Sequence, residues 1–174
     1  MSASFDFDEV DQFLCGTIGE PGARVFFLQV VQGTSIVSVK LEKQQVALLA
    51  DYLDRLLSTQ ELPDGPPATN GDLVLPVIAE WMVGSMMVAI NEATGRVVVI
   101  AQELGDESDE DDEDDEDDVF DDDEELAELR IALTRNQVVE FIAAARELVA
   151  GGRPSCRLCG RPMDPEGHNC PRWN

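Results

Sequence analysis

The chain of 174 residues has few basic residues, a single histidine and no long apolar run. Its 12 Lys+Arg face 36 Asp+Glu, and the net charge of −24 disfavours binding to a nucleic-acid backbone or an anionic membrane surface. No stretch approaches the roughly 20 apolar residues of a membrane-spanning helix, and the acidic N-terminus lacks the basic start of a signal peptide. We therefore expect a cytoplasmic protein that has no membrane partner and for which nucleic-acid binding is disfavoured.

Almost half of the acidic residues lie in one run. Residues 106–125 hold 17 acidic residues and no basic one, so the rest of the chain is only mildly acidic. Adjacent carboxylates repel each other and almost nothing in the run is apolar, which predicts a disordered insertion over 105–125. We interpret this insertion as a solvated segment that keeps the protein soluble. Two alternatives are a tether for a basic partner, anchored by Val119 and Phe120, and a site for a hard cation.

The spacing of the apolar residues predicts an α+β protein with antiparallel strands. Alternating or continuous apolar residues indicate strands over 10–18, 24–32, 35–41, 77–91, 96–104 and 126–133. Apolar residues at helical spacing indicate amphipathic helices over 43–59 and 135–150, and Thr134 is suited to cap the second helix. Pro, Gly and Asn residues mark 61–72 as a linker.

The order of three strands and a helix occurs twice. Residues of 41–57 match those of 133–149 at one constant offset, and Phe13 and Thr17 match Trp81 and Ser85 at another. This pattern predicts two duplicated β-β-β-α halves, an internal repeat related by a pseudo-two-fold axis. The first half would cover 1–60 and the second 73–150. The alternative is that two unrelated units of this kind look alike. Neither half alone would bury a large core, so we expect the two to dock.

Three of the four cysteines and the only histidine lie in the last 20 residues. Cys156 and Cys159 form a C-x₂-C-G turn, and His168 and Cys170 follow within easy loop-closing distance. Structural zinc sites are closed tetrahedra of four nitrogen or sulfur ligands. The sequence therefore predicts a structural Zn²⁺ bound by these four residues, in a zinc-knuckle tail over 151–174.

The tail allows other interpretations. A redox C-x₂-C pair usually starts a helix, whereas Pro and Gly follow here. A catalytic zinc would need an open coordination position and a base such as Glu166, and four protein ligands leave no position open. Basic and aromatic residues near the cluster could contact nucleic acid or an acidic protein, or pair with acids of the chain itself: Arg153, Arg157, Arg161, Arg172 and Trp173.

Three functions compete on this evidence. We favour a non-catalytic binding or adaptor protein with a protein partner. The sequence has a small predicted metal-binding segment and no recognisable set of catalytic residues. The second hypothesis is an enzyme or small-molecule binder with a site between the halves, using Arg24, Arg96, Gln29 and Gln102. Nucleic-acid binding through the tail ranks last. The remaining cysteine, Cys15, lies in an apolar strand and is expected to pack in the core.

Two end motifs carry a family resemblance: FLCGTIGEPGARVFFLQ near the start and CRLCGRPMDPEGHNCPRWN at the end. With the acidic run between them, they make the chain similar to an actinobacterial family of uncharacterised proteins over essentially its whole length. The resemblance implies a zinc-ribbon-like tail whose ligands match Cys156, Cys159, His168 and Cys170. It implies no activity, because members carry a conserved domain of unknown function.

Overall fold

The computed structural model describes residues 2–20, 22–69, 71–105, 126–151, 156–160, 163 and 168–172. The strands in these ranges are β1 (Phe5–Phe7), β2 (Gln12–Ile18), β3 (Val25–Gln32), β4 (Ser35–Leu41), β5 (Val83–Asn91), β6 (Arg96–Glu103) and β7 (Glu128–Leu133). The helices are α1 (Lys43–Thr59) and α2 (Arg135–Ala150). The predicted α+β class is confirmed. The acidic insertion lies outside the described residues except for Gly105.

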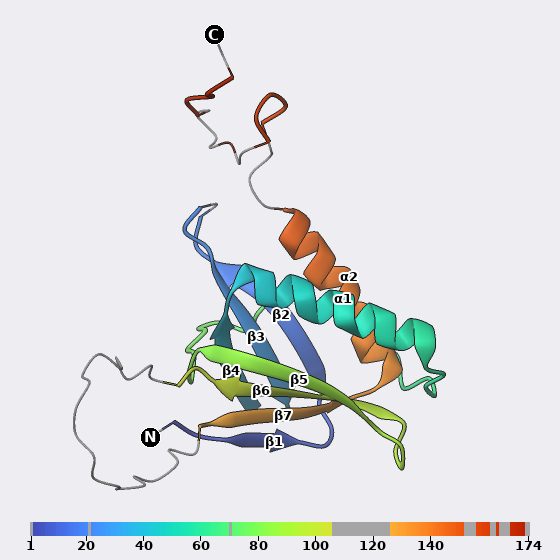
Figure 1. The fold of residues 1–174 in the computed structure, drawn as a ribbon. Coiled ribbons are helices and arrows are strands. Elements are labelled where there is room, and N and C mark those ends of the chain that lie inside the picture. Colours follow the sequence, from blue (N-terminus) through green and yellow to red (C-terminus); the bar gives the residue numbers. More distant parts are fainter. Residues whose placement is uncertain are drawn as a thin grey trace, which may run out of the picture.

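The strands form a three-stranded sheet, in the order β2-β3-β4, and a four-stranded sheet, in the order β1-β7-β6-β5. Neighbouring strands are antiparallel except β1, which pairs in parallel with β7. We expected every strand to be antiparallel to its neighbours, and this expectation is wrong for β1. This strand belongs to the first predicted half, yet it forms the edge of the sheet that the second half builds (Figure 1).

The expected strand over 77–91 begins later, at Val83. The residues just before it run beside β4: the Lys40 N–H donates to the Trp81 carbonyl at 2.9 Å, and Lys40 and Met82 form a parallel bridge. The backbone therefore links the two sheets at this point, and the chain then diverges from β4 into the second sheet.

Both helices pack on the same side of the sheets and contact each other (Figure 1). The apolar stripe of α1 buries Val46, Leu49 and Leu53, and α2 buries Phe141, whose ring stacks on Phe13 of β2 at a centroid distance of 4.6 Å. Residues from both sheets and both helices form one continuous apolar core. The second helix thus packs on a strand of the first half.

The two helices start in the same way. The Gln45 Oε1 atom accepts a hydrogen bond from the Glu42 N–H, and Gln137 Oε1 accepts one from the Thr134 N–H. The other end of each amide reaches across the molecule: Gln45 Nε2 donates to the Val83 carbonyl at 3.2 Å, and Gln137 Nε2 donates to the Val10 carbonyl at 2.7 Å. Each helix start is tied to the opposite half. This layout is compatible with the duplication, which stays a prediction.

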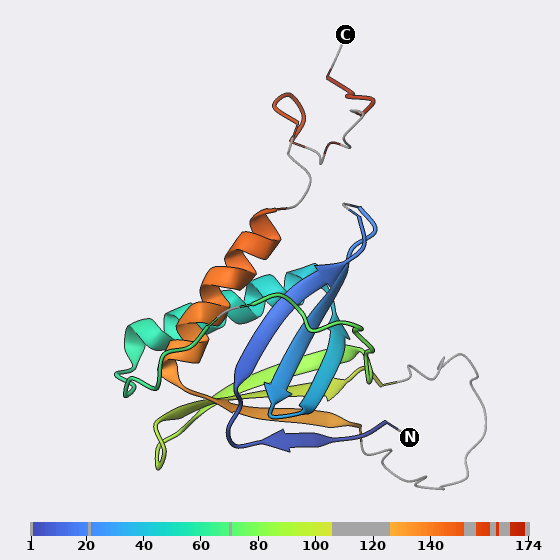
Figure 2. The same cartoon turned by 180° about the vertical axis from the view of Figure 1, so that it is seen from behind.

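The segment between α1 and β5 crosses the outer face of the sheet β2-β3-β4 (Figure 2). Gln29 holds it there. This side chain is fully buried, and its amide accepts from the Val74 N–H at 2.7 Å and donates to the Val74 carbonyl at 3.1 Å and to Ser38 Oγ at 3.0 Å. Next to this contact, Leu73 fills the space that a Cβ on Gly16 would need.

Replacing Gln29 with leucine is expected to lower the free energy of unfolding by about 2–4 kcal/mol, because the three groups that the amide satisfies would lose their partner. Urea denaturation of the wild type and the variant measures this difference. Gln102→Leu is the matched control, since Gln102 accepts only a hydrogen bond from the exposed Ser85 hydroxyl. Equal losses in the two variants would contradict the assigned role of Gln29.

Candidate metal centre and a pocket between strands

The four predicted ligands lie together. One ligand atom from each of Cys156, Cys159, His168 and Cys170 lies within 4.8 Å of all the others. The first two sit on a tight turn that the Gly160 N–H closes by donating to the Cys156 carbonyl at 2.8 Å. Gly160 has a φ of 71°, in the left-handed region that glycine adopts at little cost. The residues therefore lie close enough to hold one metal ion.

The distances fit a tetrahedral zinc site. The Cys156 and Cys170 sulfurs lie 3.8 Å apart, and the Cys159 sulfur lies 3.2 Å from His168 Nε2. Zn–S bonds of about 2.3 Å at tetrahedral angles separate two sulfurs by about 3.8 Å. His168 Nδ1 is buried and has no hydrogen-bond partner among the described residues. The other ring nitrogen, Nε2, faces the Cys159 sulfur, so the imidazole is oriented toward the cluster.

Backbone amides favour the thiolate form of Cys156. The N–H of Cys159, and next that of Leu158, lower the pKa of Cys156 from its ordinary value. Burial raises the pKa of Cys170, on the other side of the cluster. Metals bind cysteine as the thiolate, so the turn prepares Cys156 to act as the first ligand.

The rest of the tail is described in part. Arg157 and Arg172 are exposed, and Arg172 donates to the Leu158 carbonyl at 3.1 Å. The other residues proposed for nucleic-acid contact (Arg153, Arg161 and Trp173) and the candidate base Glu166 lie outside the described residues. Cys156–Cys159 form a turn instead of the start of a helix, which disfavours the redox-pair interpretation.

The four residues proposed for a site between the halves have different contacts among the described residues. Arg24 donates to the Gly151 carbonyl at the end of α2, at 3.0 Å, and Arg96 forms an ion pair with Glu9 at 2.9 Å. Gln29 is a buried structural residue, as described above. Only Gln102 lines a pocket that the structure describes. The two arginines instead tie the ends of neighbouring elements together.

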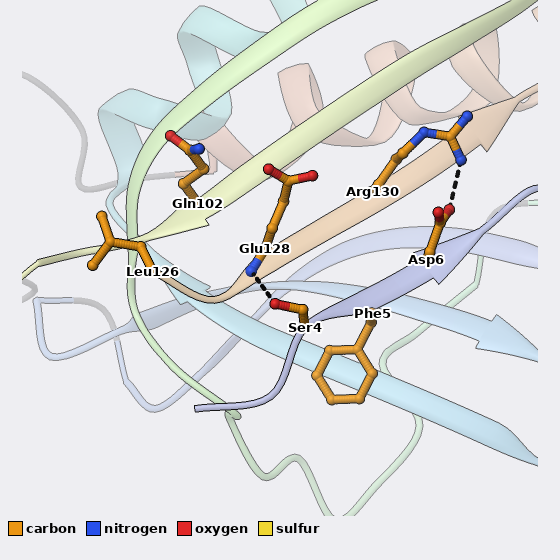
Figure 3. A pocket seen from close by; sticks show the side chains of 7 residues that line it. All are labelled: Ser4, Phe5, Asp6, Gln102, Leu126, Glu128 and Arg130. Carbon is orange, nitrogen blue, oxygen red and sulfur yellow. Dashed lines mark hydrogen bonds and ion pairs between the residues drawn. The ribbon is translucent and has the colours of Figure 1, made fainter. Parts of the chain in front are cut away.

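That pocket has a volume of about 550 Å³ and opens at one end of the four-stranded sheet (Figure 3). It is lined by Ser4, Phe5, Asp6, Gln102, Leu126, Glu128 and Arg130. Arg130 bridges the carboxylates of Asp6 and Asp8, so its charge is largely balanced. Sequence reasoning missed this pocket because it depends on the parallel pairing of β1 with β7, two strands more than 120 residues apart that share no local signal.

Among the described residues, no helix is long and apolar enough to cross a membrane. Fold and cluster together define an α+β protein with a candidate Cys₃His metal site near its C-terminal end. The chain belongs to the family described as "Protein of unknown function (DUF3090)", whose model matches residues 5–170 and so includes all four candidate ligands. The family resemblance is thereby confirmed, and the actinobacterial source stays an expectation. No curated protein and no solved structure matches the chain.

Proposed function

We propose that this chain is a non-catalytic zinc-binding protein, with a structural Zn²⁺ held by Cys156, Cys159, His168 and Cys170. The observation that supports it is the convergence of one ligand atom from each residue to within 4.8 Å. Four protein ligands fill a tetrahedral shell, so the ion has no open position at which to bind and activate water. Its role is to close the loop between the two ligand pairs and so to order the tail.

We further propose that the ordered tail serves as a contact for a protein partner, which makes the protein an adaptor. Leu158 at the turn is 51% exposed and stands beside two exposed arginines, Arg157 and Arg172. An apolar side chain flanked by cations is a surface that suits a protein with acidic and apolar residues. A cytoplasmic location agrees with this proposal, because a reducing compartment keeps the three cysteines available for a metal.

Protein purified without added metal is expected to carry one zinc per chain, and Cys159→Ser is expected to carry none, as measured by mass spectrometry of the metal content. The reason is that three ligands hold structural zinc far more weakly than four. Cys15→Ser is the control: it removes a thiol outside the cluster and should keep the zinc. If the wild type is kept reduced and carries no zinc, the proposal is wrong.

The adaptor role has its own test. Cross-linking and affinity purification are run with the wild type and with Cys159→Ser, and a partner recovered in stoichiometric amount only with the wild type supports it. Repeated recovery of no such partner counts against an adaptor. Salt-sensitive binding of the wild type to RNA or DNA in a shift assay would instead favour nucleic-acid binding through the tail.

The pocket supports a second candidate function, the binding of a small molecule between the halves. Its walls come from the first half (Ser4, Phe5, Asp6) and from the second, and they carry more negative than positive charge. A small organic cation is therefore the expected ligand. A thermal-shift screen of amines tests this on the wild type, on Glu128→Gln and on the exposed control Glu147→Gln. Stabilisation that is lost only in Glu128→Gln supports it, and the absence of any stabilising amine counts against it.

A further inference from the structure

The three thiols of the cluster are not equivalent. The sulfurs of Cys156 and Cys170 face each other at 3.8 Å, whereas the Cys159 sulfur has His168 Nε2 as its neighbour at 3.2 Å. Cys170 is partly exposed to solvent, as is Cys159, whereas Cys156 is 8% exposed. One thiol of the facing pair is therefore open to a small oxidant, and the other lies next to it and is shielded.

We propose that hydroperoxides oxidise Cys156 and Cys170 to a disulfide and thereby release the zinc, so that the tail is a redox-sensitive metal switch. This inference rests on the proposed zinc site. It concerns the regulation of that site and adds no catalytic role. The oxidant is hydrogen peroxide or an organic hydroperoxide.

The reaction balances in two steps. Both cysteines are thiolates when they bind zinc. The Cys170 thiolate attacks one peroxide oxygen and the O–O bond breaks. The products are a sulfenic acid on Cys170 and a hydroxide ion from hydrogen peroxide, or an alkoxide ion from an organic hydroperoxide. The Cys156 thiolate then attacks the Cys170 sulfur, an S–S bond forms, and a hydroxide ion leaves. Each sulfur loses one electron and each peroxide oxygen gains one. Two of the four zinc ligands are consumed in the process.

Metal release follows from the loss of these two ligands. A disulfide sulfur is a poor ligand for zinc, because the thiolate is the form of cysteine that binds the metal. Only Cys159 and His168 would remain, and two ligands do not hold a structural zinc ion. The S–S bond length of about 2.05 Å requires the two sulfurs, now 3.8 Å apart, to approach each other by less than 2 Å.

The test uses the zinc-loaded full-length protein and a chromogenic zinc chelator. Hydrogen peroxide in small excess is expected to release about one zinc per chain, and dithiothreitol with added zinc is expected to restore it. Trypsin cleaves after Arg157 and separates Cys156 from Cys159 and Cys170. Mass spectrometry after alkylation should then find the two peptides cross-linked, with the alkyl group on Cys159.

Two variants that keep four nitrogen or sulfur ligands sharpen the test. Cys170→His removes one thiol of the facing pair, and its zinc release by peroxide is expected to be at least about 10-fold slower than that of the wild type. Cys159→His leaves the facing pair intact, and its release is expected to stay within about 3-fold of the wild type. Cys15→Ser should behave as the wild type.

The outcomes separate the two proposals. A reduced wild type that carries no zinc overturns the proposed site itself. If the protein carries zinc but keeps it in the presence of peroxide, the proposed redox switch is wrong and the proposed zinc site stands. A disulfide between Cys156 and Cys159, with the alkyl group on Cys170, also overturns the switch as stated here, because the facing pair would then not be the reactive one.

Discussion

Replacing Phe141 with alanine is expected to lower the free energy of unfolding by about 3–5 kcal/mol, which corresponds to a fall in melting temperature on the order of 10 °C. The Phe141 side chain is fully buried in α2, and its ring stacks on Phe13 of β2 with 27° between the planes. Truncation removes this pair and leaves a cavity between the second helix and the first sheet. Chemical denaturation monitored by fluorescence or circular dichroism measures the loss.

The same truncation at Tyr52 is the matched control. Tyr52 is an aromatic residue of α1 with 51% of its surface exposed, and its replacement by alanine is expected to change the stability by less than about 1 kcal/mol. A loss at Phe141 no larger than the loss at Tyr52 would contradict the core described here. The zinc content of Phe141→Ala should equal that of the wild type, because the four candidate ligands lie outside the core cluster.

The Phe141 variant also tests whether the two predicted halves depend on each other. Because α2 packs on β2 and each helix start is tied to the opposite half, we expect Phe141→Ala to unfold in a single transition at a lower denaturant concentration. Two separate transitions would mean that the halves fold as independent units, against the single apolar core.

The elements that the sequence predicts correctly are those whose signal is local. The helix over 43–59 and the strand over 35–41 have the same bounds in the structure, because helical spacing and a run rich in β-branched residues each show within one segment. Thr134 was predicted to cap the second helix, and its hydroxyl accepts from the Gln137 N–H as expected. Each of these features depends on residues a few positions apart.

What depends on distant parts of the chain could not be predicted in this way. The three residues of β1 have a local alternation that fits any sheet edge, and nothing near them indicates a parallel partner in β7. The segment over 61–72 has the composition of a free linker. The residues that follow it are nevertheless held on a sheet face by Gln29, a polar residue inside an otherwise apolar strand.

The same distinction applies to the candidate sites. The four residues of the metal cluster lie within 15 positions, so spacing and ligand chemistry alone were enough to group them. The pocket needs Asp6 from β1 beside Glu128 and Arg130 from β7, and only the fold brings these side chains together. Repeated Arg and Gln positions suggested a site, but Arg24 and Arg96 make separate structural contacts.

Alkaline pH is expected to destabilise the protein through Cys15. Burial in the core raises the pKa of this thiol from 9.0 to about 12. Below pH 9 the thiol is protonated in the folded and the unfolded chain, and the whole contribution to stability is present. Between pH 9 and pH 12 the unfolded chain releases the proton while the folded chain retains it, so the stability falls as the pH rises. The full loss amounts to about 4 kcal/mol.

Cys15→Val isolates this effect, since valine is a small apolar residue that has no thiol and occupies the position, Val83, that the predicted duplication matches to Cys15. Free energies of unfolding are measured for both proteins in a reducing buffer, at pH 8 and at pH 10.5. All other residues are the same in the two proteins, so their contributions cancel in the comparison. From pH 8 to pH 10.5 the wild type should lose about 2 kcal/mol more than the variant. An equal loss in both would mean that Cys15 ionises as readily in the folded chain as in the unfolded one, and that the strand around it admits water.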